Sequence, residues 1–327
     1  MATMNVIEAV RSAMLEEMRR DDSVFVLGED VGSRGGVFLA TQGFVDEFGE
    51  ARVIDTPLAE SAIAGIAVGA AMRGHRPIAE VQFADFIWPT VNQLIGEAAR
   101  IRYGSHNKVH VPLVVRCPYG GHVRGGLYHS QSVESYFAHT PGLKVVAPST
   151  PYDAKGLLKA AIRANDPVIV LEHKRTYRSV RGEVPDDDYT VPIGVADLKR
   201  QGTEATIVTY GLTVHYALQA AEELAREGAD VEVLDLRTLS PIDEEAILTS
   251  VRKTNRLLVV HEDNRTGGLG AEVSAIAAEG AFDSLDAPIM RCTGPDIPSM
   301  PFAPTLEAAF MPTADKIAEA LRRLLAY

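Results

Sequence analysis

The first 180 residues alternate between continuous apolar runs and stretches with helical spacing. Pro, Gly or charged residues bound each apolar run, which predicts strands at 24–28, 52–55, 77–83, 112–117, 144–148 and 167–172. Helices are predicted between them at 5–20, 60–74, 86–103 and 154–165, with Pro89 in the first turn of the third. Strands that are apolar on both faces and alternate with helices indicate a parallel sheet covered by helices on each side.

A segment rich in charge, Pro and Gly interrupts this alternation. We predict a linker there, at residues 181–203, between a first domain at 1–180 and a second at 204–327. After the linker, the runs ATIVTYG, DVEVLDL, RLLVVHE and PIMRC again alternate with helical stretches. The chain is therefore expected to form two α/β domains, which its length of 327 residues also favours.

The composition narrows the class of partner. A net charge of −12 argues against a nucleic-acid partner, which usually requires a basic face. No window offers the roughly 18 uninterrupted apolar residues of a membrane span. Cys117 and Cys292 both lie in strand-like apolar runs, which predicts reduced thiols and a cytoplasmic location rather than a disulfide framework.

Two segments of the first domain carry candidate chemistry. Glu60 begins a helix made almost wholly of small residues, where its carboxylate either stabilises the helix N-terminus or acts as a buried acid. Phe83, Phe86 and Trp88 fall between a strand end and a helix start. In an open α/β sheet, ligands bind at the carboxyl ends of strands, so an aromatic there stacks on a flat ring unless it is simply core.

His129 lies in the glycine- and serine-rich stretch RGGLYHSQSVES (124–135). Glycines let the backbone approach a ligand closely, and a histidine exchanges a proton near neutral pH. Taken alone, this pattern favours a solvated loop histidine over an active-site residue. GGLGAE (267–272) is not a complete dinucleotide fingerprint, and a helix start needing small residues explains it.

Four stretches together resemble the beta subunit of the thiamine-diphosphate-dependent 2-oxoacid dehydrogenase decarboxylases. They are LGEDVG (27–32), DTPLAESAIAGIAVGAAMRG (55–74), GGLYHSQSVES (125–135) and VVAPSTPYDAKGLLKAAIR (145–163). The resemblance continues through LDLRTLSPID and GPDIPSMPFAP and covers essentially the whole chain. LYHSQS and GPDIPSMPFAP are more similar to the branched-chain type than to the pyruvate type. The resemblance implies a transketolase-like fold, with an N-terminal pyrimidine-binding domain and a transketolase C-terminal domain.

The resemblance also implies roles for individual residues. Glu60 matches the glutamate that hydrogen-bonds a ring nitrogen of the cofactor's aminopyrimidine, and Phe86 matches the aromatic that packs on that ring. His129 matches the active-site histidine of the beta subunit. Glu29 resembles a second buried acid that relays protons between paired active sites.

The family chemistry explains these residue types. Thiamine diphosphate becomes nucleophilic when its thiazolium carbon loses a proton to its own aminopyrimidine, which must first take the imino form. A carboxylic acid at the ring nitrogen favours that form, and burial favours the protonated carboxyl group. His129 would manage a proton as the acyl group passes to a lipoyl group, or orient the substrate carboxylate.

Metals and partners follow from the same resemblance. The family holds magnesium and the diphosphate through a GDG motif, which this chain lacks. The magnesium site is therefore expected in an alpha subunit, within an α2β2 heterotetramer that serves a dihydrolipoyl acyltransferase core and its lipoyl domain. Some members bind structural potassium, and the matching positions here are Leu113, Val114, Ala161 and Asp166.

Three alternatives stay open at this point. A pyruvate or acetoin dehydrogenase beta subunit would share the fold. A non-catalytic assembly subunit would explain the missing diphosphate motif, although it would not need Glu60, Phe86 and His129 together. A nicotinamide dehydrogenase is disfavoured because no complete glycine fingerprint follows an early strand.

Overall fold

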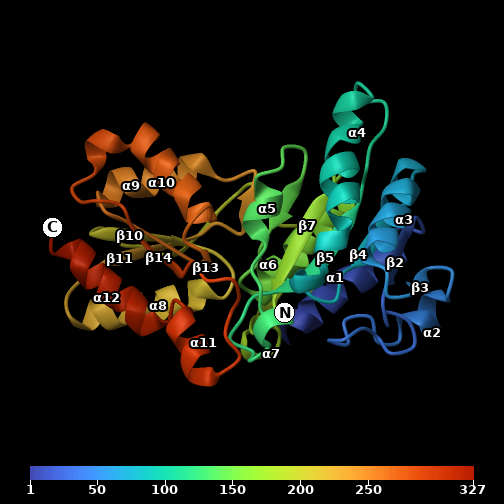
Figure 1. Cartoon of the computed structure of the whole chain (residues 1–327), viewed down its shortest axis with the longest axis horizontal. Coiled ribbons are helices and arrows are strands. Elements are labelled where there is room, and N and C mark those ends of the chain that lie inside the picture. The colour runs from blue at the N-terminus through green and yellow to red at the C-terminus, as the bar shows by residue number, and fades with distance from the viewer. The chain divides into compact units, whose positions relative to one another are not determined.

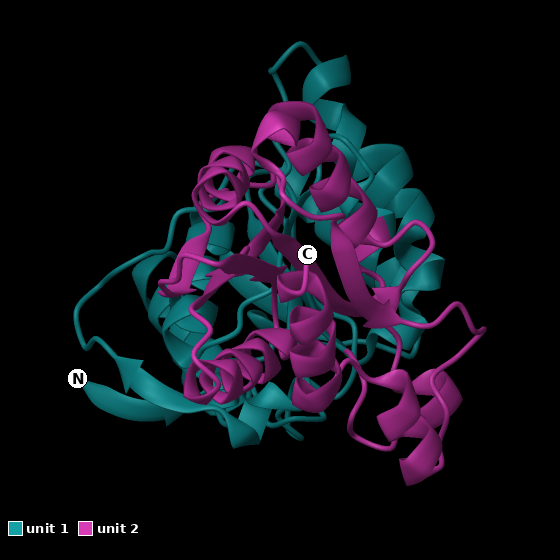
Figure 2. Ribbon diagram, turned by 90° about the vertical axis from the view of Figure 1, so that its left-hand side faces the viewer, with its two compact units in different colours: residues 1–119, 136–193 teal, residues 120–135, 194–327 magenta.

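The computed structural model describes all 327 residues, and its contacts divide the chain into two compact units, coloured separately in Figure 2. The first unit comprises Met1–Tyr119 and Tyr136–Ile193, and the second comprises Gly120–Ser135 and Gly194–Tyr327. The stretch expected to be a linker is therefore divided between the units after Ile193. It also contributes two strands, β8 (Arg181–Val184) and β9 (Asp197–Arg200).

The first unit is built on a parallel sheet whose strands follow the order β6-β7-β5-β4-β2-β3. All six predicted strands are confirmed, as β2 (Val24–Gly28), β3 (Val53–Asp55), β4 (Arg76–Glu80), β5 (Val114–Tyr119), β6 (Lys144–Val146) and β7 (Val168–His173). Every residue of β2, β5 and β7 is buried, which is why these strands read as continuous apolar runs.

Helices cover both faces of this sheet (Figure 1). The helices of the unit are α1 (Val6–Arg20), α2 (Phe44–Phe48), α3 (Glu60–Met72), α4 (Ala99–Gly104), α6 (Pro151–Arg163) and α7 (Thr176–Ser179). α1 and α6 lie side by side on one face and bury Met14, Met18 and Leu157 against the strands. α3 contacts β4 and the helical stretch at 92–98. The predicted helix at 5–20 starts at Val6 because Asn5 and Glu8 form a reciprocal capping box.

The predicted helix at 86–103 is broken into shorter pieces. The chain makes two 3₁₀ turns, η1 (Ala84–Phe86) and η2 (Trp88–Thr90), then a π-helix, η3 (Asn92–Ala98), before α4. Pro89 has no N–H to donate and its ring crowds the preceding turn, so it does not continue a regular helix. π-Helical turns are rare and often lie at functional sites.

Two further short elements are β1 (Ala2–Asn5) and α5 (Glu134–Ala138). β1 pairs antiparallel with β8, as a ribbon separate from the main sheet. α5 starts in the second unit and ends in the first. Neither was predicted, because both elements are short.

The second unit holds a five-stranded sheet in the order β14-β13-β10-β11-β9, in which only the edge strand β9 is antiparallel. Its other strands are β10 (Ala205–Thr209), β11 (Val231–Asp235), β13 (Leu257–Asn264) and β14 (Met290–Gly294). Its longer helices are α8 (Thr213–Arg226), α9 (Glu244–Thr254), α10 (Leu269–Gly280) and α12 (Ala314–Leu325). α8 and α12 cover one face, and α9 and α10 cover the other (Figure 1).

The remaining short elements of this unit are η4 (Gly126–Tyr128), β12 (Thr238–Ser240), η5 (Phe282–Ser284) and α11 (Pro304–Phe310). No helix in the chain combines the length and the apolar character that crossing a membrane requires. Both cysteines are unpaired, with Cys117 buried and Cys292 half-buried. The order of the elements along the chain shows the expected alternation of strands and helices in both units.

Candidate functional site

Three of the predicted site residues follow neighbouring strands of the first unit. Glu29 comes directly after β2, Glu60 begins α3 beyond the end of β3, and Phe86 closes the turn beyond β4. β3, β2 and β4 lie next to one another and run parallel, so their carboxyl ends meet at one edge of the sheet. This edge is where open α/β sheets bind ligands.

Glu29 and Glu60 are close enough to interact electrostatically. Partial burial raises the pKa of Glu29, and repulsion from the carboxylates of Glu60 and Asp30 raises it further. One carboxyl oxygen of Glu29, Oε1, is buried and has no hydrogen-bond partner. A buried acceptor without a donor is costly, so this pair suits a ligand that brings N–H donors to it.

Glu60 does not cap its own helix in the usual sense. It occupies the first position of α3, and the preceding residue, Ala59, offers no side-chain hydrogen bond to the helix N-terminus. Its half-buried side chain lies where the helix dipole favours a negative charge. The dipole interaction and a catalytic role are compatible at this position.

Phe86 belongs to a chain of aromatic contacts. Its ring meets the edge of Phe83 at 6.0 Å between centroids, and Phe83 meets Phe38 at 5.6 Å. Phe83 and Phe86 are only half-buried, and Trp88 is exposed. The alternative in which all three aromatics are core is therefore wrong, and Phe86 retains surface on which a ring can pack.

His129 belongs to the second unit, where it ends the turn η4. Two glycines shape this turn. Gly126 has a positive φ of 61°, and a Cβ on Gly125 would lie 2.5 Å from the backbone oxygen of His129 and 2.7 Å from its Cβ. The glycines thus allow the backbone to fold tightly against His129 itself.

We predict that Gly125→Ala destabilises the chain by about 1–3 kcal/mol, because the new methyl group must displace backbone atoms rather than a flexible side chain. Urea unfolding of the full chain measures this. Gly104→Ala is the matched control, since a Cβ at Gly104 meets nothing within 4 Å. Equal midpoints for the two variants would contradict the prediction.

The residues predicted for potassium have protein partners already. The carbonyl oxygen of Leu113 accepts a hydrogen bond from the N–H of Val168, and that of Ala161 accepts one from the N–H of Ala164. Although partial burial opposes ionisation of Asp166, hydrogen bonds from Arg102 and Lys144 hold the pKa of its carboxyl group below the ordinary value. An ion here would rely on second lone pairs of carbonyl oxygens, including that of Val114. Potassium binding stays a prediction.

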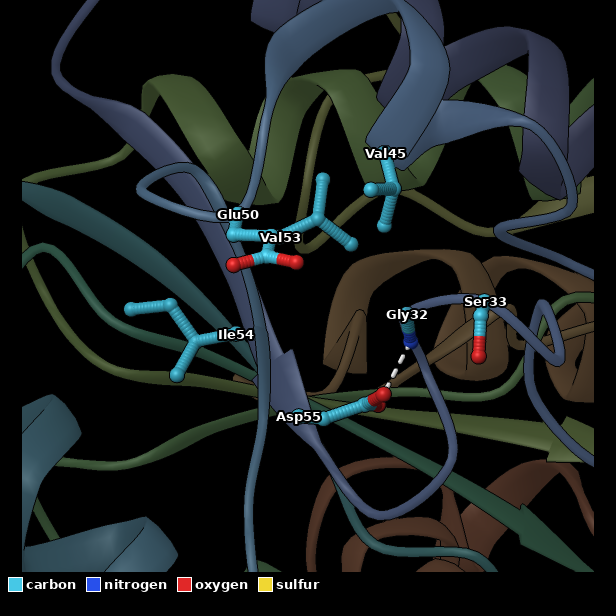
Figure 3. Close-up of a pocket in the computed structure, with 7 residues that line it drawn as sticks. All are labelled: Gly32, Ser33, Val45, Glu50, Val53, Ile54 and Asp55. Carbon is cyan, nitrogen blue, oxygen red and sulfur yellow. Dashed lines mark hydrogen bonds between the residues drawn. The ribbon is translucent and has the colours of Figure 1, made fainter.

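No group of three or more His, Cys, Asp or Glu side chains is arranged to hold a metal ion. A cavity of about 430 Å³ does lie beside β3 (Figure 3), lined by Gly32, Ser33, Val45, Glu50, Val53, Ile54 and Asp55. The carboxylate of Asp55 points to the backbone of Gly32 and accepts a hydrogen bond from its N–H, with 2.6 Å between Oδ1 and the nitrogen. None of the predicted site residues lines this cavity.

Sequence reasoning missed a buried charged cluster in the first sheet. Arg116 on β5 donates to Glu80 on β4 at 2.6 Å and to both carboxylate oxygens of Glu172 on β7 at 2.7 Å. The hydroxyl of Tyr177 donates to Glu172 at 2.6 Å. The signal was present, because PIAEVQF, PLVVRC and PVIVLE each contain one charged residue in an otherwise apolar strand.

The glycines of GGLGAE have a structural explanation. Cβ atoms on Gly268 and Gly270 would lie 2.7 and 2.6 Å from the buried ring of His261. The N-terminus of α10 therefore packs directly on this imidazole, and only small residues fit. This supports the interpretation of the segment as a helix start.

The comparisons with known proteins agree with this architecture. Residues 2–180 match the family of the transketolase pyrimidine-binding domain, and residues 194–317 match the transketolase C-terminal domain. A 2-oxoisovalerate dehydrogenase subunit beta of Bacillus subtilis (strain 168) is 61% identical over 324 residues, which cover 99% of each chain. The chain belongs to the family of 2-oxoacid dehydrogenase beta subunits.

A second relative and a solved structure are less similar in sequence. A pyruvate dehydrogenase E1 component subunit beta of Bacillus subtilis (strain 168) is 47% identical over 327 residues and covers all of both chains. A solved structure described as a split gene transketolase, inactive beta4 tetramer, superposes with a TM-score of 0.79 over 99% of this chain and 98% of its own. Its identity is 23%, so it supports the transketolase-like α/β fold alone.

Proposed function

We propose that this chain is the beta subunit of a branched-chain 2-oxoacid dehydrogenase decarboxylase. The observation that carries the proposal is the 61% identity to a 2-oxoisovalerate dehydrogenase subunit beta, against 47% to a pyruvate dehydrogenase subunit beta. The reaction is oxidative decarboxylation of a branched 2-oxoacid and reductive acylation of a lipoyl group on a dihydrolipoyl acyltransferase. A cytoplasmic location remains a prediction from the two unpaired cysteines.

The residues at the sheet edge fit the pyrimidine part of thiamine diphosphate. When bound, this cofactor supplies the nucleophilic carbon and the electron sink for decarboxylation. Glu60 would hold a ring nitrogen, Phe86 would pack on the ring plane, and the unpartnered Oε1 of Glu29 supports a hydrogen-bond donor nearby. Burial, and then repulsion from the carboxylate of Glu60, raises the pKa of Glu29 and favours its protonated form.

His129 is proposed to handle a proton on the lipoyl side of the reaction or to orient the substrate carboxylate. Its half-buried ring and the tight glycine turn support a fixed imidazole with access to ligand. The alpha subunit is proposed to supply the magnesium and diphosphate site, since this sequence has no GDG motif. The active assembly is then an α2β2 heterotetramer.

The test is decarboxylation by this chain co-expressed with its alpha subunit, with thiamine diphosphate and magnesium present. We expect kcat/KM for 3-methyl-2-oxobutanoate to exceed that for pyruvate by at least about tenfold, the usual discrimination for one or two methyl groups in an apolar pocket. The chain without its alpha subunit is expected to be inactive. A preference for pyruvate would reject the branched-chain assignment, and robust turnover by the isolated chain would reject the shared site.

A further inference from the structure

The segment that carries His129 is anchored at both ends to one strand of the second unit. Near the start of the segment, the N–H of Gly121 donates to the carboxylate of Glu262. At its end, the hydroxyl of Ser135 donates to Asp263 at 2.6 Å. Glu262 and Asp263 are consecutive residues near the carboxyl end of β13, so one short stretch fixes both ends of residues 120–135.

Further contacts hold the middle of the segment. The N–H of Arg124 donates to Glu307 of α11 at 2.9 Å, and the side-chain amide of Gln131 donates to the hydroxyl of Ser299 at 3.0 Å. His129 lies between these two anchored positions. Its placement therefore depends on side chains that never need to touch a ligand.

Glu134 is the unusual member of this arrangement. Its side chain is fully buried, Oε1 accepts the hydroxyl of Tyr210 at 2.8 Å, and Oε2 has no partner. The charged groups that face it are the carboxylates of Asp263 and Glu262. Burial first, and then repulsion from Asp263, raises the pKa of Glu134 well above its ordinary value.

The histidine on the same strand, His261, does not relieve this crowding of carboxyl groups. His261, whose ring stacks on Tyr210 at 6.2 Å, is buried, and burial lowers its pKa to about 4, so the ring is neutral. Burial also raises the pKa of Asp263, although hydrogen bonds from Ser135 and the N–H of Asn264 favour its charged form. The pair of Glu134 and Asp263 therefore retains a proton at pH values where an exposed pair would have lost both.

We propose that Glu134 and Asp263 are positioning residues for His129, and that a proton lock, meaning a proton retained by these two buried carboxyl groups, keeps the end of the His129 segment attached to β13. This inference rests on the proposed function for the role of His129. The lock itself concerns only contacts within the second unit. When the proton is lost, two buried carboxylates face each other, and the segment 120–135 is expected to loosen.

The sign of the pH effect follows from the raised pKa of Glu134. Between the ordinary pKa of a glutamate, about 4.3, and the raised value, the folded chain binds more protons than the unfolded chain, so stability falls as the pH rises. Glu134→Gln keeps the shape and cannot ionise. Its Tm relative to the unmodified chain is therefore expected to increase as the pH rises from 5 toward the raised pKa of Glu134.

The experiment compares the full chain with Glu134→Gln, Glu134→Ala and Asp263→Asn by hydrogen exchange at pH 7 and by thermal unfolding from pH 5 to 8. Exchange in peptides covering residues 120–135 should rise about tenfold in Glu134→Ala, the effect of losing one buried hydrogen bond, and stay within about twofold in Glu134→Gln and Asp263→Asn. Glu232→Gln is the matched control, since Glu232 is equally buried but paired with Lys253.

The outcomes separate this inference from the proposed function. If Glu134→Gln loosens the segment as much as alanine does, or if its Tm advantage does not grow with pH, the proton lock is rejected whatever the enzyme's activity. If Glu134→Ala fails to fold, the pH dependence of the Tm of Glu134→Gln is sufficient to accept or reject the proton lock. In the complex with the alpha subunit, kcat should fall about tenfold in Glu134→Ala and return with glutamine, because small displacements of an active-site group cost rate.

Discussion

Glu60→Ala is expected to lower decarboxylation by the complex about 10²- to 10⁴-fold, the usual range for removing a group that moves a proton in the transition state. The reason is that no other carboxyl group stands at the start of α3, and Ala59 cannot replace it. Glu29 would then keep a buried oxygen that has no hydrogen-bond partner, without the neighbouring carboxylate of Glu60. Steady-state turnover and cofactor affinity, measured together, distinguish loss of chemistry from loss of binding.

The control for Glu60 is a glutamate with the same helical position and no proposed chemistry. Glu244 is the first residue of α9, as Glu60 is of α3, and it is exposed. Glu244→Ala removes the same interaction with a helix dipole and should leave turnover within about twofold. Glu60→Gln should be nearly as inactive as alanine, since an amide cannot exchange the proton. Full activity in either Glu60 variant would show that Glu60 only stabilises its helix.

Arg116→Met is expected to cost about 3–5 kcal/mol of unfolding free energy, because it leaves two buried carboxylates without their cation. Burial raises the pKa of Glu80, but the hydrogen bonds and charge of Arg116 oppose this rise. Arg116→Lys should also be destabilising, since one ammonium group cannot reproduce the two parallel bonds to Glu172 together with the bond to Glu80. Urea unfolding of the full chain gives the loss directly.

The triple variant Arg116→Met, Glu80→Gln and Glu172→Gln tests the explanation. It should recover a large part of the stability, because the penalty arises from unpaired charge and not from lost volume. Arg19→Met is the control, since its pair with Glu47 is exposed and should leave the urea midpoint nearly unchanged. A triple variant as unstable as the single one would mean that the lost packing of the guanidinium, and not unpaired charge, causes the loss of unfolding free energy.

The sequence was sufficient for elements whose signal is local. α1 and β2 were predicted because helical spacing and a bounded apolar run are both visible within one window. β1 and β8 were not, since four residues carry little pattern and their pairing joins distant parts of the chain. The same limit hid the cluster around Arg116, because its three charges lie in separate predicted strands and only the register aligns Glu80 with Arg116.

The candidate site was predicted to a different extent. Glu60, Phe86 and His129 were recognised through the family resemblance, and the adjacency of β3, β2 and β4 gives the first two a common edge. Glu134 lies in the stretch that carries His129, but the sequence alone indicated no role for it. Its importance depends on Asp263 and Tyr210, which lie more than seventy residues further along the chain, at sequence separations of 129 and 76 residues for Glu134.

The assignment of residues 120–135 to the second unit has a consequence for synthesis of the chain. A ribosome releases this segment well before β13, whose Glu262 and Asp263 hold its ends. At about 5–20 residues per second, the segment waits roughly 6–25 s for its anchors. During that interval the rest of the first 180 residues can form the first unit, so we expect the His129 segment to become ordered after it.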